Sequence, residues 1–542
     1  MLPTVDTYAE LGAQFQWAIP EFYNIGVDVC DKWAEREPAR LALIHKTRDG
    51  KILRLTFDEL RALSNQTANL LRAHAVRRGD RVGILLPQAP ETGYAHIAAY
   101  KLGAIAVPLF SLFGVDALHY RLADSGTKIV ITDSVGAQKI ESIRAQLPAL
   151  ECVFNIDGAL HNALNFHTLR DSQQKTFTPE ITRADEPALI IYTSGTTGQP
   201  KGALHAQRVL LGHLPGVEIS HNFFPQEGDR IWTPADWAWI GGLYDVLMPA
   251  WHHGVTVVSH RFEKFDAEAA FQLLEDFEIR NAFLPPTALK MMRTIANPET
   301  RWKFKVRTIA SGGETLGAEL LEWGRKTFGV SINEFYGQTE CNMIVSNCNA
   351  IMESHPGLMG RAVPGHTLEI LDAEGNPVAR NEVGQIAVKR PDPVMFLEYW
   401  NNPNATRDKF QKDYLLTGDL GIRDDNGYIR FVGRNDDVIN SAGYRIGPGE
   451  IEDCLLKHPA VSMAAVIGVS DTLRGEVVKA FIVLHEKFSA NDSLAQEIQN
   501  FVRERLAAHE YPRHISFVRE LPLTTTGKIM RRTLREWHAQ NF

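Results

Sequence analysis

The sequence predicts an α/β protein: a large N-terminal domain of stacked α/β sheets that includes a small β-rich subdomain, and a small α+β C-terminal domain. Three observations support this fold class. The 542 residues exceed what one hydrophobic core usually covers, about 250–300 residues. Apolar segments of strand type alternate with helical stretches, which is typical of a parallel sheet covered by helices. Past Pro364 the pattern changes to short strands and tight turns.

The first strands are expected at residues 81–86, 104–109 and 128–132, because each segment is apolar and a helical stretch separates it from the next. A similar alternation recurs from Gly254 through residues 306–309. Residues 188–191 form a further apolar run of strand type. We therefore expect a loop that follows this run to leave the end of a buried strand, where ligands of open α/β sheets bind.

The second half of the chain carries different signals. The tripeptide 425–427 reads Asp-Asn-Gly between Leu420 and Ile429, which is a strong hairpin signal. In the tail, Gly449 opens a predicted helix and residues 461–469 read as a strand. We predict an N-terminal domain over residues 1–435 and a C-terminal domain over residues 436–542.

Composition narrows the functional class. A net charge of −8 and a pI near 6.2 argue against broad binding of nucleic acid, which needs a basic face. A local basic patch at Lys528, Arg531, Arg532 and Arg535 could still hold a charged cofactor, or be a solvated helix face. The 5 cysteines are scattered and form no CxxC pair, which indicates neither a disulfide framework nor a zinc site and suits a reducing cytoplasm.

Membrane insertion and targeting are also not expected. The N-terminus has no basic start followed by an apolar core, so it does not resemble a signal or transit peptide. The most apolar stretch, residues 237–251, is interrupted by Asp245 and Pro249 and is shorter than the ~20 residues that span a bilayer. We interpret this stretch as a candidate pocket wall.

The strongest functional signal is the run at residues 192–202, YTSGTTGQPKG. Its glycines permit backbone conformations in which several N–H groups face one anion. Its hydroxyl side chains and one lysine add further donors. This composition predicts a loop that binds nucleotide phosphates. The candidates are Thr193, Ser194, Gly195, Thr196, Thr197, Gly198 and Lys201.

A Walker loop is the familiar alternative, and the spacing from Gly195 to Lys201 agrees with it. However, Pro200 stands where the second glycine belongs, and Gly202 stands where a magnesium-binding Ser or Thr is needed. The Walker interpretation therefore fails on its chemistry.

Further motifs must be explained together with this loop: Ser-Gly-Gly-Glu at 311–314, Tyr-Gly-Gln-Thr-Glu at 336–340, Thr-Gly-Asp at 417–419, Gly-Arg-Asn-Asp-Asp at 433–437 and Thr-Gly-Lys at 526–528. In this order they resemble the adenylate-forming superfamily of acyl-CoA synthetases, luciferases and peptide-synthetase adenylation domains. The resemblance covers nearly the whole chain. It implies a carboxylic acid that is first joined to AMP, with release of pyrophosphate, and then transferred to a thiol.

The resemblance also implies roles for individual residues. The loop from Thr193 to Lys201 would hold the β- and γ-phosphates of ATP, Thr339 would contact the α-phosphate, and Glu340 would help place Mg²⁺. Asp419 and Arg434 would bind the ribose, and Lys528 would bridge the substrate carboxylate and an ATP oxygen. Taken alone, Asp419 could cap a turn and Lys528 could be a surface lysine. The adenine is expected to contact Gly313, Glu314, Glu334, Phe335, Tyr336, Gly337 and Gln338.

The resemblance further implies that the C-terminal domain is mobile and that its hinge is Asp436. Lys528 would enter the site for adenylation, and the domain would then turn to present another face for thioester formation. Coenzyme A would be recognised by this domain. The matching residues are Ala442, Gly443, Tyr444, Arg445, Arg474, Tyr511, Pro512 and Arg513.

The acyl pocket is predicted from a departure from acetate-specific relatives, which narrow it with Trp, Val and Thr. Here the corresponding residues are Gly337, Gly312 and Gly241, while Ile240 keeps an aliphatic wall. Missing side chains would lengthen the pocket, so we expect an acid larger than acetate. Straight medium-chain, branched, alicyclic and aromatic acids remain open. Further apolar candidates, some of which must be core, are Trp237, Trp239, Leu243, Tyr244 and Met248.

The sequence therefore predicts a cytoplasmic, ATP-dependent acyl-CoA synthetase that uses ATP, Mg²⁺ and coenzyme A and binds no nucleic acid. The alternatives are a luciferase-like or carrier-loading adenylating enzyme and a catalytically silent nucleotide- or acyl-binding sensor. If Lys528 is catalytic, acetylation would remove its charge and stop adenylation. A lysine acetyltransferase and a deacetylase are then possible partners.

Overall fold

The computed structural model describes residues 1–193, 199–314, 316–434, 437, 439–441, 444–471, 475–506, 511–524 and 528–541. It confirms a mixed α/β protein with a large and a smaller part. The chain divides into two compact units. Unit 1 contains Met1–Thr367 and Lys389–Phe410, and unit 2 contains Leu368–Val388 and Gln411–Phe542. The small β-rich subdomain thus groups with the C-terminal segment. The predicted boundary between residues 435 and 436 stays a prediction.

The first large sheet of unit 1 contains all three of the strands expected near the N-terminus, and β3, β4 and β5 pair in parallel as predicted. The strand expected at 188–191 is β8, which is buried along most of its length. Strand β9 runs antiparallel to β8, so the glycine-rich loop joins two strands of a hairpin. In sheet order the strands are β19 (Glu398–Tyr399), β9 (Lys201–Ala206), β8 (Pro187–Thr193), β4 (Ile105–Pro108), β3 (Arg81–Leu85), β5 (Ile129–Thr132), β6 (Cys152–Asn155) and β7 (Leu164–Asn165).

The second large sheet of unit 1 is parallel at its centre and antiparallel at both ends. Its β13 and β14 lie side by side in parallel, which brings two of the sequence motifs together at the carboxyl ends of these strands. In order the strands are β16 (Arg361–Ala362), β15 (Cys341–Ser346), β14 (Ile332–Gln338), β13 (Thr308–Gly312), β12 (Asn281–Phe283), β10 (Arg230–Trp232), β11 (Thr256–His260), β1 (Leu41–Lys46) and β2 (Ile52–Thr56).

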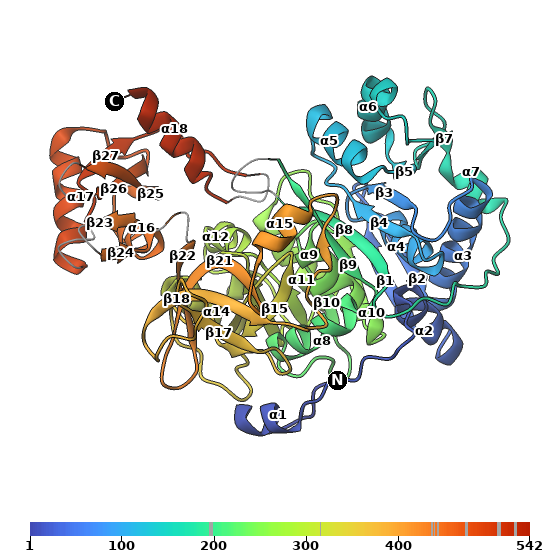
Figure 1. Ribbon diagram of the computed structural model, residues 1–542, viewed down its shortest axis with the longest axis horizontal. Coiled ribbons are helices and arrows are strands. Elements are labelled where there is room, and N and C mark those ends of the chain that lie inside the picture. Colours follow the sequence, from blue (N-terminus) through green and yellow to red (C-terminus); the bar gives the residue numbers. More distant parts are fainter. Residues whose placement is uncertain are drawn as a thin grey trace. The chain divides into compact units, whose positions relative to one another are not determined.

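Helices pack against these sheets, and α3 and α4 contact each other beside β3 and β4 (Figure 1). Helix α3 begins at a capping box in which Thr56 and Glu59 satisfy each other's backbone N–H groups. The helical segments of unit 1 are α1 (Tyr8–Gln14), η1 (Val27–Asp31), α2 (Lys32–Arg36), α3 (Phe57–Ala73), α4 (Pro90–Lys101), α5 (Val115–Ser125), α6 (Ser134–Ile143), η2 (Arg144–Gln146), α7 (Phe166–Asp171), α8 (Val209–Ser220), α9 (Ile240–Gly242), η3 (Leu243–Leu247), α10 (Met248–His252), α11 (Ala267–Asp276), α12 (Pro286–Arg293), α13 (Pro298–Arg301), α14 (Ala318–Phe328) and α15 (Pro403–Asp408).

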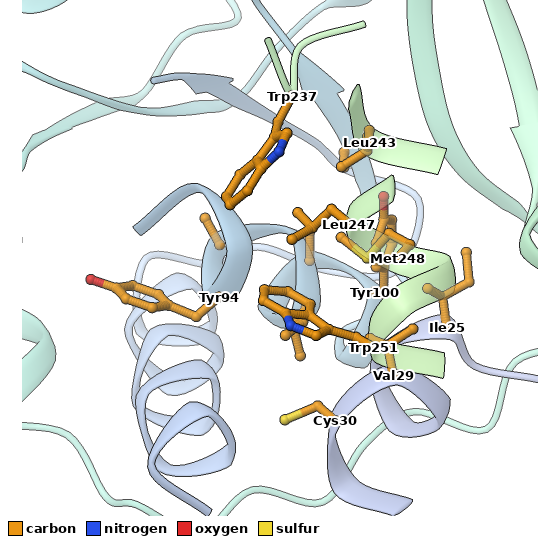
Figure 2. Packing of buried hydrophobic residues seen from close by; sticks show 14 of the residues in the cluster. Ile25, Val29, Cys30, Tyr94, Tyr100, Trp237, Leu243, Leu247, Met248 and Trp251 are labelled. Atoms are coloured by element: carbon orange, nitrogen blue, oxygen red, sulfur yellow. The ribbon is translucent and has the colours of Figure 1, made fainter. Parts of the chain in front are cut away.

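The main core of unit 1 lies where η3 and α10 meet α4 and η1. Figure 2 shows Leu247, Met248 and Trp251 turned toward Tyr94 and Tyr100 of α4. A Cβ at Gly93 would lie 2.5 Å from the Trp251 ring, so the indole can approach α4 only because this position has no side chain. The apolar stretch at 237–251 is therefore mainly core. Its residues Trp237, Leu243, Tyr244 and Met248 are at most 1% exposed.

Unit 2 contains two small sheets. The hairpin predicted from Asp-Asn-Gly joins β21 and β22, and Gly427 has a φ of +84° at the turn. The predicted helix at 449 and strand at 461–469 correspond to α16 and β25. The elements are β17 (Leu368–Leu371), β18 (Val383–Lys389), β20 (Phe410–Gln411), β21 (Tyr414–Arg423), β22 (Ile429–Arg434), β23 (Ile439–Ser441), β24 (Tyr444–Ile446), α16 (Pro448–Leu456), β25 (Val461–Asp471), β26 (Gly475–Leu484), α17 (Asp492–Arg505), β27 (His514–Phe517) and α18 (Arg531–Asn541).

Candidate active site

The glycine-rich loop connects the ends of β8 and β9, where Thr193 and Lys201 are direct partners in the ladder. The Thr193 hydroxyl donates to the Lys201 carbonyl oxygen over 3.4 Å. Just before the loop, the Tyr192 hydroxyl donates to Asp124 Oδ2 over 2.6 Å. These contacts fix both ends of the loop. Its residues Ser194, Gly195, Thr196, Thr197 and Gly198 lie outside the described residues.

Glu340 lies close to this hairpin through Tyr399. Strand β19 pairs with β9, with Tyr399 opposite Ala203, so the tyrosine is placed beside the loop end. Its hydroxyl donates a hydrogen bond to Glu340 Oε1, and the centroid of its ring lies 5.2 Å from Lys201 Nζ. Phe396 N donates to the Glu340 carbonyl oxygen over 2.9 Å. The Tyr399 side chain therefore contacts the buried Glu340 carboxylate through its hydroxyl and the Lys201 ammonium group through its ring.

The motif at 336–340 forms the end of β14 and the turn to β15, and Thr339 and Glu340 occupy that turn. Gln338 Oε1 accepts a hydrogen bond from Lys409 Nζ over 3.2 Å. Glu340 is 7% exposed, whereas Tyr336, Gly337, Gln338 and Thr339 are half-buried. The predicted nucleotide-contacting residues 336–339 are therefore partly accessible, whereas Glu334 and Phe335 are buried.

The end of β13 lies beside this strand, with Gly312 paired with Phe335 and Ser311 paired with Glu334. Gly313 follows with a φ of +95°, a conformation that favours glycine. The Thr287 hydroxyl donates to Glu314 Oε1 over 2.8 Å. Gly313 and Glu314 thus follow directly after a strand that pairs with residues 334–335, and the adenine site stays a prediction.

The three glycines predicted to open the acyl pocket lie around one cluster of side chains. A Cβ at Gly312 would lie 2.6 Å from the Phe335 ring, and a Cβ at Gly337 would lie 2.1 Å from Asn342 Oδ1. Neighbouring side chains occupy the space at these two positions, and the expectation that both absences lengthen the pocket stays a prediction. At Gly241 the nearest atoms are looser, with Phe283 Cε1 at 3.0 Å.

The aromatic surroundings of Gly241 differ from the core behind it. Trp239, Ile240 and Gly241 are half-buried, and the Trp239 ring packs with Phe110 and Phe113 at centroid distances of 5.6 and 5.9 Å. Residues 239–241 are therefore partly exposed, and the rings of Trp239, Phe110 and Phe113 form an apolar surface beside them.

Sequence reasoning missed three polar residues near the site, Tyr399, Asp245 and Asn342. For Asp245 a signal existed, because it is a carboxylate within an apolar stretch. It proves to be 4% exposed, and it accepts a hydrogen bond from Asn342 Nδ2 over 2.7 Å. Tyr399, in a two-residue strand, carries no comparable sequence signal.

In unit 2, Asp419 and Arg434 are direct partners between β21 and β22. Arg434 Nε lies 4.0 Å from Asp419 Oδ1, and Asp419 is 5% exposed. The Asp419 backbone N–H donates to the Thr417 hydroxyl over 3.1 Å, and that hydroxyl donates to the Ile386 carbonyl oxygen. The carboxylate predicted to bind ribose is thereby held beside the arginine predicted for the same sugar.

Lys528 is exposed, and its backbone N–H donates to the Thr524 hydroxyl over 3.0 Å. The proposed basic patch around it is largely engaged within unit 2. Arg531 forms hydrogen bonds of 2.6 and 2.7 Å with both Glu452 oxygens, and Arg535 lies 2.9 Å from Asp437 Oδ1. These arginines stabilise the fold of the unit.

Of the residues predicted to contact coenzyme A, the structure describes Tyr511, Pro512 and Arg513. The Arg513 guanidinium lies 5.1 Å from the Tyr511 ring centroid, and its backbone N–H donates to the Val478 carbonyl oxygen over 2.8 Å. Tyr444 and Arg445 belong to β24, but their side chains lie outside the described part. The predicted residues Ala442, Gly443 and Arg474 and the predicted hinge Asp436 also lie outside it.

The described residues contain no group of three or more His, Cys, Asp and Glu side chains that could hold a metal ion by themselves. Among their helices, none has the length and apolar character needed to cross a membrane. All of the cysteines are free thiols.

Comparison with known proteins decides the family. The model for the AMP-binding enzyme matches residues 30–400, and the model for the AMP-binding enzyme C-terminal domain matches residues 450–528. The chain belongs to the AMP-binding enzyme family. The expected adenylate-forming fold and the placement among acyl-CoA synthetases are confirmed.

Individual relatives agree with this membership. Acyl-coenzyme A synthetase ACSM3, mitochondrial, from Rattus norvegicus is 35% identical over 98% of this chain and 93% of its own length. The solved structure of the Brucella canis acyl-CoA synthetase is 32% identical, covers 99% and 100% of the two chains and has a TM-score of 0.77. The anthranilate CoA ligase AuaEII, solved with anthranoyl-AMP, is 30% identical over 96% and 98% of the chains, with a TM-score of 0.87. Acyl-CoA synthetases of this family act on a carboxylic acid, ATP and CoA, generally with Mg²⁺.

Proposed function

We propose that this chain uses ATP to activate a carboxylic acid larger than acetate and then forms its acyl-CoA. The carboxylate oxygen attacks the α-phosphorus of ATP, which gives acyl-AMP and releases pyrophosphate. The sulfur of CoA then attacks the acyl carbon, the bond to AMP breaks, and the thiol proton is released. The observation that supports this most directly is the arrangement of Lys201 and Glu340 on either side of Tyr399, next to the glycine-rich hairpin.

We assign the binding of the ATP phosphates to residues of unit 1. Thr193, Lys201 and the loop between them would neutralise and orient the β- and γ-phosphates, and Thr339 would contact the α-phosphate. Hydrogen-bond donors held in fixed positions stabilise the negative charge that develops in the transition state. Gly313, Glu314 and residues 334–338 would enclose the adenine. The parallel pairing of β13 and β14 supports that assignment, since it sets the two segments side by side.

Glu340 suits Mg²⁺, because carboxylate oxygens are preferred ligands of this ion. Mg²⁺ is commonly held by one or two carboxylates together with substrate phosphates. A single buried carboxylate beside a phosphate-binding hairpin fits that pattern better than a cage made only of protein groups. When bound, the ion would neutralise part of the phosphate charge.

Unit 2 would supply the ribose contacts from Asp419 and Arg434 and the catalytic cation from Lys528. The lysine would hold the carboxylate and an ATP oxygen together while negative charge accumulates between them. Asp436 would act as the hinge between two arrangements. CoA would meet the segment around residues 442–445, Arg474 and residues 511–513. The exposure of Lys528 supports its role, because a group that enters a site from another segment must be accessible.

An acid larger than acetate is supported by an aromatic wall made of the half-buried Trp239 and Phe113 and the buried Phe110. Each CH₂ group that contacts such a wall contributes about 0.8 kcal/mol. Acetate would leave most of this surface without a contact.

Pyrophosphate release tests the proposal. It is measured with ATP and Mg²⁺ across acetate, propionate, isobutyrate, hexanoate, benzoate and cyclohexanecarboxylate, with and without CoA. We expect the highest rate with an acid larger than acetate, and acyl-CoA and AMP as products when CoA is present. Lys528→Ala should lose pyrophosphate release but still convert supplied acyl-AMP and CoA to the thioester. ATP binding without pyrophosphate release from any acid would instead support a silent sensor, and light emission with a luciferin would support a luciferase.

Acetylation of Lys528 is part of the same proposal. Loss of the ammonium charge should stop adenylation while thioester formation from acyl-AMP continues. Chemical installation of acetyl-lysine at position 528 and assay of both half-reactions tests this. Loss of both half-reactions would exclude the selective effect.

We further propose a reducing compartment and specifically the cytoplasm as the location. The free thiols support a reducing environment. The relative from Rattus norvegicus is described as mitochondrial, so cell fractionation must separate these two compartments. Recovery of the native protein with mitochondria would contradict the cytoplasmic assignment.

A further inference from the structure

Three polar side chains, Asp245, Asn342 and His213, are buried together behind the predicted acyl site. Asp245 and Asn342 are each 4% exposed, and His213 is 0% exposed. Asn342 Nδ2 donates to Asp245 Oδ1 over 2.7 Å, and His213 Nε2 lies 4.0 Å from the same oxygen. The three residues come from η3, β15 and α8, so three separate elements converge on one polar cluster.

One atom of this cluster, His213 Nε2, is buried and has no hydrogen-bond partner among the described residues. His213 Nδ1 lies 2.8 Å from the Val209 carbonyl oxygen, so this nitrogen carries the ring proton and Nε2 is left as an acceptor. No hydrogen bond from a described residue to Asp245 Oδ2 accompanies the one that Oδ1 accepts from Asn342. A buried polar atom without a partner, such as His213 Nε2, destabilises the protein by about 1–3 kcal/mol. His213 Nε2 therefore indicates that another molecule completes the cluster.

The open side of the cluster faces the glycine positions. A Cβ at Gly241 would lie 3.6 Å from Asp245 Oδ2, and a Cβ at Gly337 would lie 2.1 Å from Asn342 Oδ1. Both glycines are half-buried, although the three polar residues behind them are buried. The polar oxygens of Asp245 and Asn342 are thus next to two glycines of the predicted acyl site, and the Phe283 ring lies beside Gly241 as well.

The charge state of the cluster limits what it can bind. Burial raises the pKa of Asp245 well above the usual range of an aspartate, against a smaller lowering by the Asn342 hydrogen bond. Burial also lowers the pKa of His213 to about 3. His213 is therefore uncharged at neutral pH, and burial favours the uncharged form of Asp245. A neutral carboxyl offers one O–H donor, and the neutral imidazole offers one acceptor at Nε2.

A hydroxyl group matches this pair, since it accepts one hydrogen bond and donates another. A second carboxylate or an ammonium group does not match, because a charge would be buried without a charged partner. We propose that Asp245 is a specificity-determining residue that binds a hydroxyl group on the acyl portion of the substrate acid. This inference rests on the proposed acyl-CoA synthetase activity and assigns a substrate class to its acyl site.

The test compares acids in pairs that differ by one hydroxyl group: benzoate with its 2-, 3- and 4-hydroxy derivatives, and hexanoate with 3- and 6-hydroxyhexanoate. Pyrophosphate release gives kcat/KM for each acid, and the measured quantity is the ratio of hydroxy acid to parent acid. We expect the wild-type ratio to be at least 10 for one pair. Asp245→Leu, which keeps the volume but removes both oxygens, should lower that ratio 10- to 100-fold, mainly through KM of the hydroxy acid.

Glu218→Gln is the matched control. Glu218 is also a buried carboxyl beside a histidine, with Oε1 3.0 Å from His253 Nε2, but it is not among the groups nearest to the three glycines. Its substitution should leave the hydroxy-to-parent ratio at the wild-type value. If Asp245→Leu does not fold, Asp245→Ala is measured instead, since it also removes both oxygens and offers no donor.

The outcomes separate this inference from the proposed function. An equal ratio in the wild type and the Asp245 variant for every pair would overturn the role of Asp245 and would leave a buried water as the occupant of the cluster. If the wild type activates no acid, the proposed function fails. Thermal stabilisation by the same acid pairs then still tests the inference, because only the wild type should be stabilised more by the hydroxy acid.

Discussion

The Tyr399 hydroxyl donates a hydrogen bond to the Glu340 carboxylate, and the ring of this tyrosine faces the Lys201 ammonium group. The tyrosine lies in β19, and Glu340 lies in the turn between β14 and β15, so the contact joins the two large sheets of unit 1. This hydrogen bond fixes the orientation of the carboxylate proposed to hold Mg²⁺.

Tyr399→Phe should therefore weaken the metal-dependent step. A hydrogen bond to a charged group contributes about 1.5–3 kcal/mol, which corresponds to roughly a 10- to 100-fold effect. We expect a higher Mg²⁺ concentration for half-maximal pyrophosphate release and weaker binding of Mn²⁺, measured by electron paramagnetic resonance with a non-hydrolysable ATP analogue.

Tyr23→Phe is the control for this change. It removes another hydroxyl–carboxylate hydrogen bond, that of Tyr23 with Asp28, which is not part of the glycine-rich hairpin. This variant should lower stability without changing the dependence on Mg²⁺. The same Mg²⁺ shift in both variants would mean that Tyr399 acts only through general stability.

Buried histidines should make the fold sensitive to acid. Burial lowers the pKa of His221 to about 3, below the ordinary value of about 6.5. Between these two values the unfolded chain binds a proton that the folded chain does not. Stability is therefore complete above pH 6.5 and falls as the pH falls toward 3, by about 1.4 kcal/mol per pH unit for this histidine. Similar lowering applies to His45, to about 4, and to His96, His205 and His213, each to about 3.

Urea unfolding at pH 7.5 and 5.5, followed by tryptophan fluorescence, checks this prediction. His221→Asn can keep a hydrogen bond to the Thr308 hydroxyl, which lies 2.8 Å from His221 Nδ1, but cannot titrate. Its loss of stability between the two pH values should be about 1 kcal/mol smaller than that of the wild type. An unchanged difference would show that His221 is protonated in both states or in neither.

The effect of a substitution at Gly93 on stability should depend on the residue at position 251. Alanine in a helix is normally favoured over glycine by about 1 kcal/mol. At position 93, however, the added methyl group would lie 2.5 Å from the Trp251 ring, and overpacking of a core costs about 1–3 kcal/mol. We expect Gly93→Ala to destabilise the wild type but to stabilise a Trp251→Phe background, as measured by a double-mutant cycle of urea unfolding. Equal effects in both backgrounds would exclude the steric explanation.

Much of the fold was predictable from local patterns. The strands at 81–86, 104–109 and 128–132 were found because fully buried parallel strands are short and apolar, and the β21–β22 hairpin was found because Asn-Gly suits its turn. The grouping of the small β-rich subdomain with the C-terminal segment was not predicted, because it depends on contacts between segments far apart in the chain.

The candidate site likewise contains residues that the sequence predicts and residues that it does not. The motifs located Thr193, Lys201, Glu340, Asp419 and Arg434. The structure places Asp419 within β21 and the other four at strand ends or in a turn. Tyr399 was missed because its importance arises only from its position next to Glu340 and Lys201. The effect of missing side chains also could not be read from the sequence, since a glycine can either open a space or let a neighbour fill it.

Gly312 provides a direct test of that last distinction. A methyl group there would lie 2.6 Å from Phe335 Cε2 and 2.8 Å from Cδ2, and the Phe335 ring is itself packed against Phe283 at a centroid distance of 5.2 Å. Gly312→Ala should therefore lower the free energy of unfolding by about 1–3 kcal/mol, and Phe335→Leu in the same chain should recover part of this loss. If Gly312 instead opened the acyl pocket, the alanine variant would keep its stability and shift its preference toward acetate. Urea unfolding together with pyrophosphate release from acetate and hexanoate separates the two explanations, because only the first predicts recovery by the second substitution.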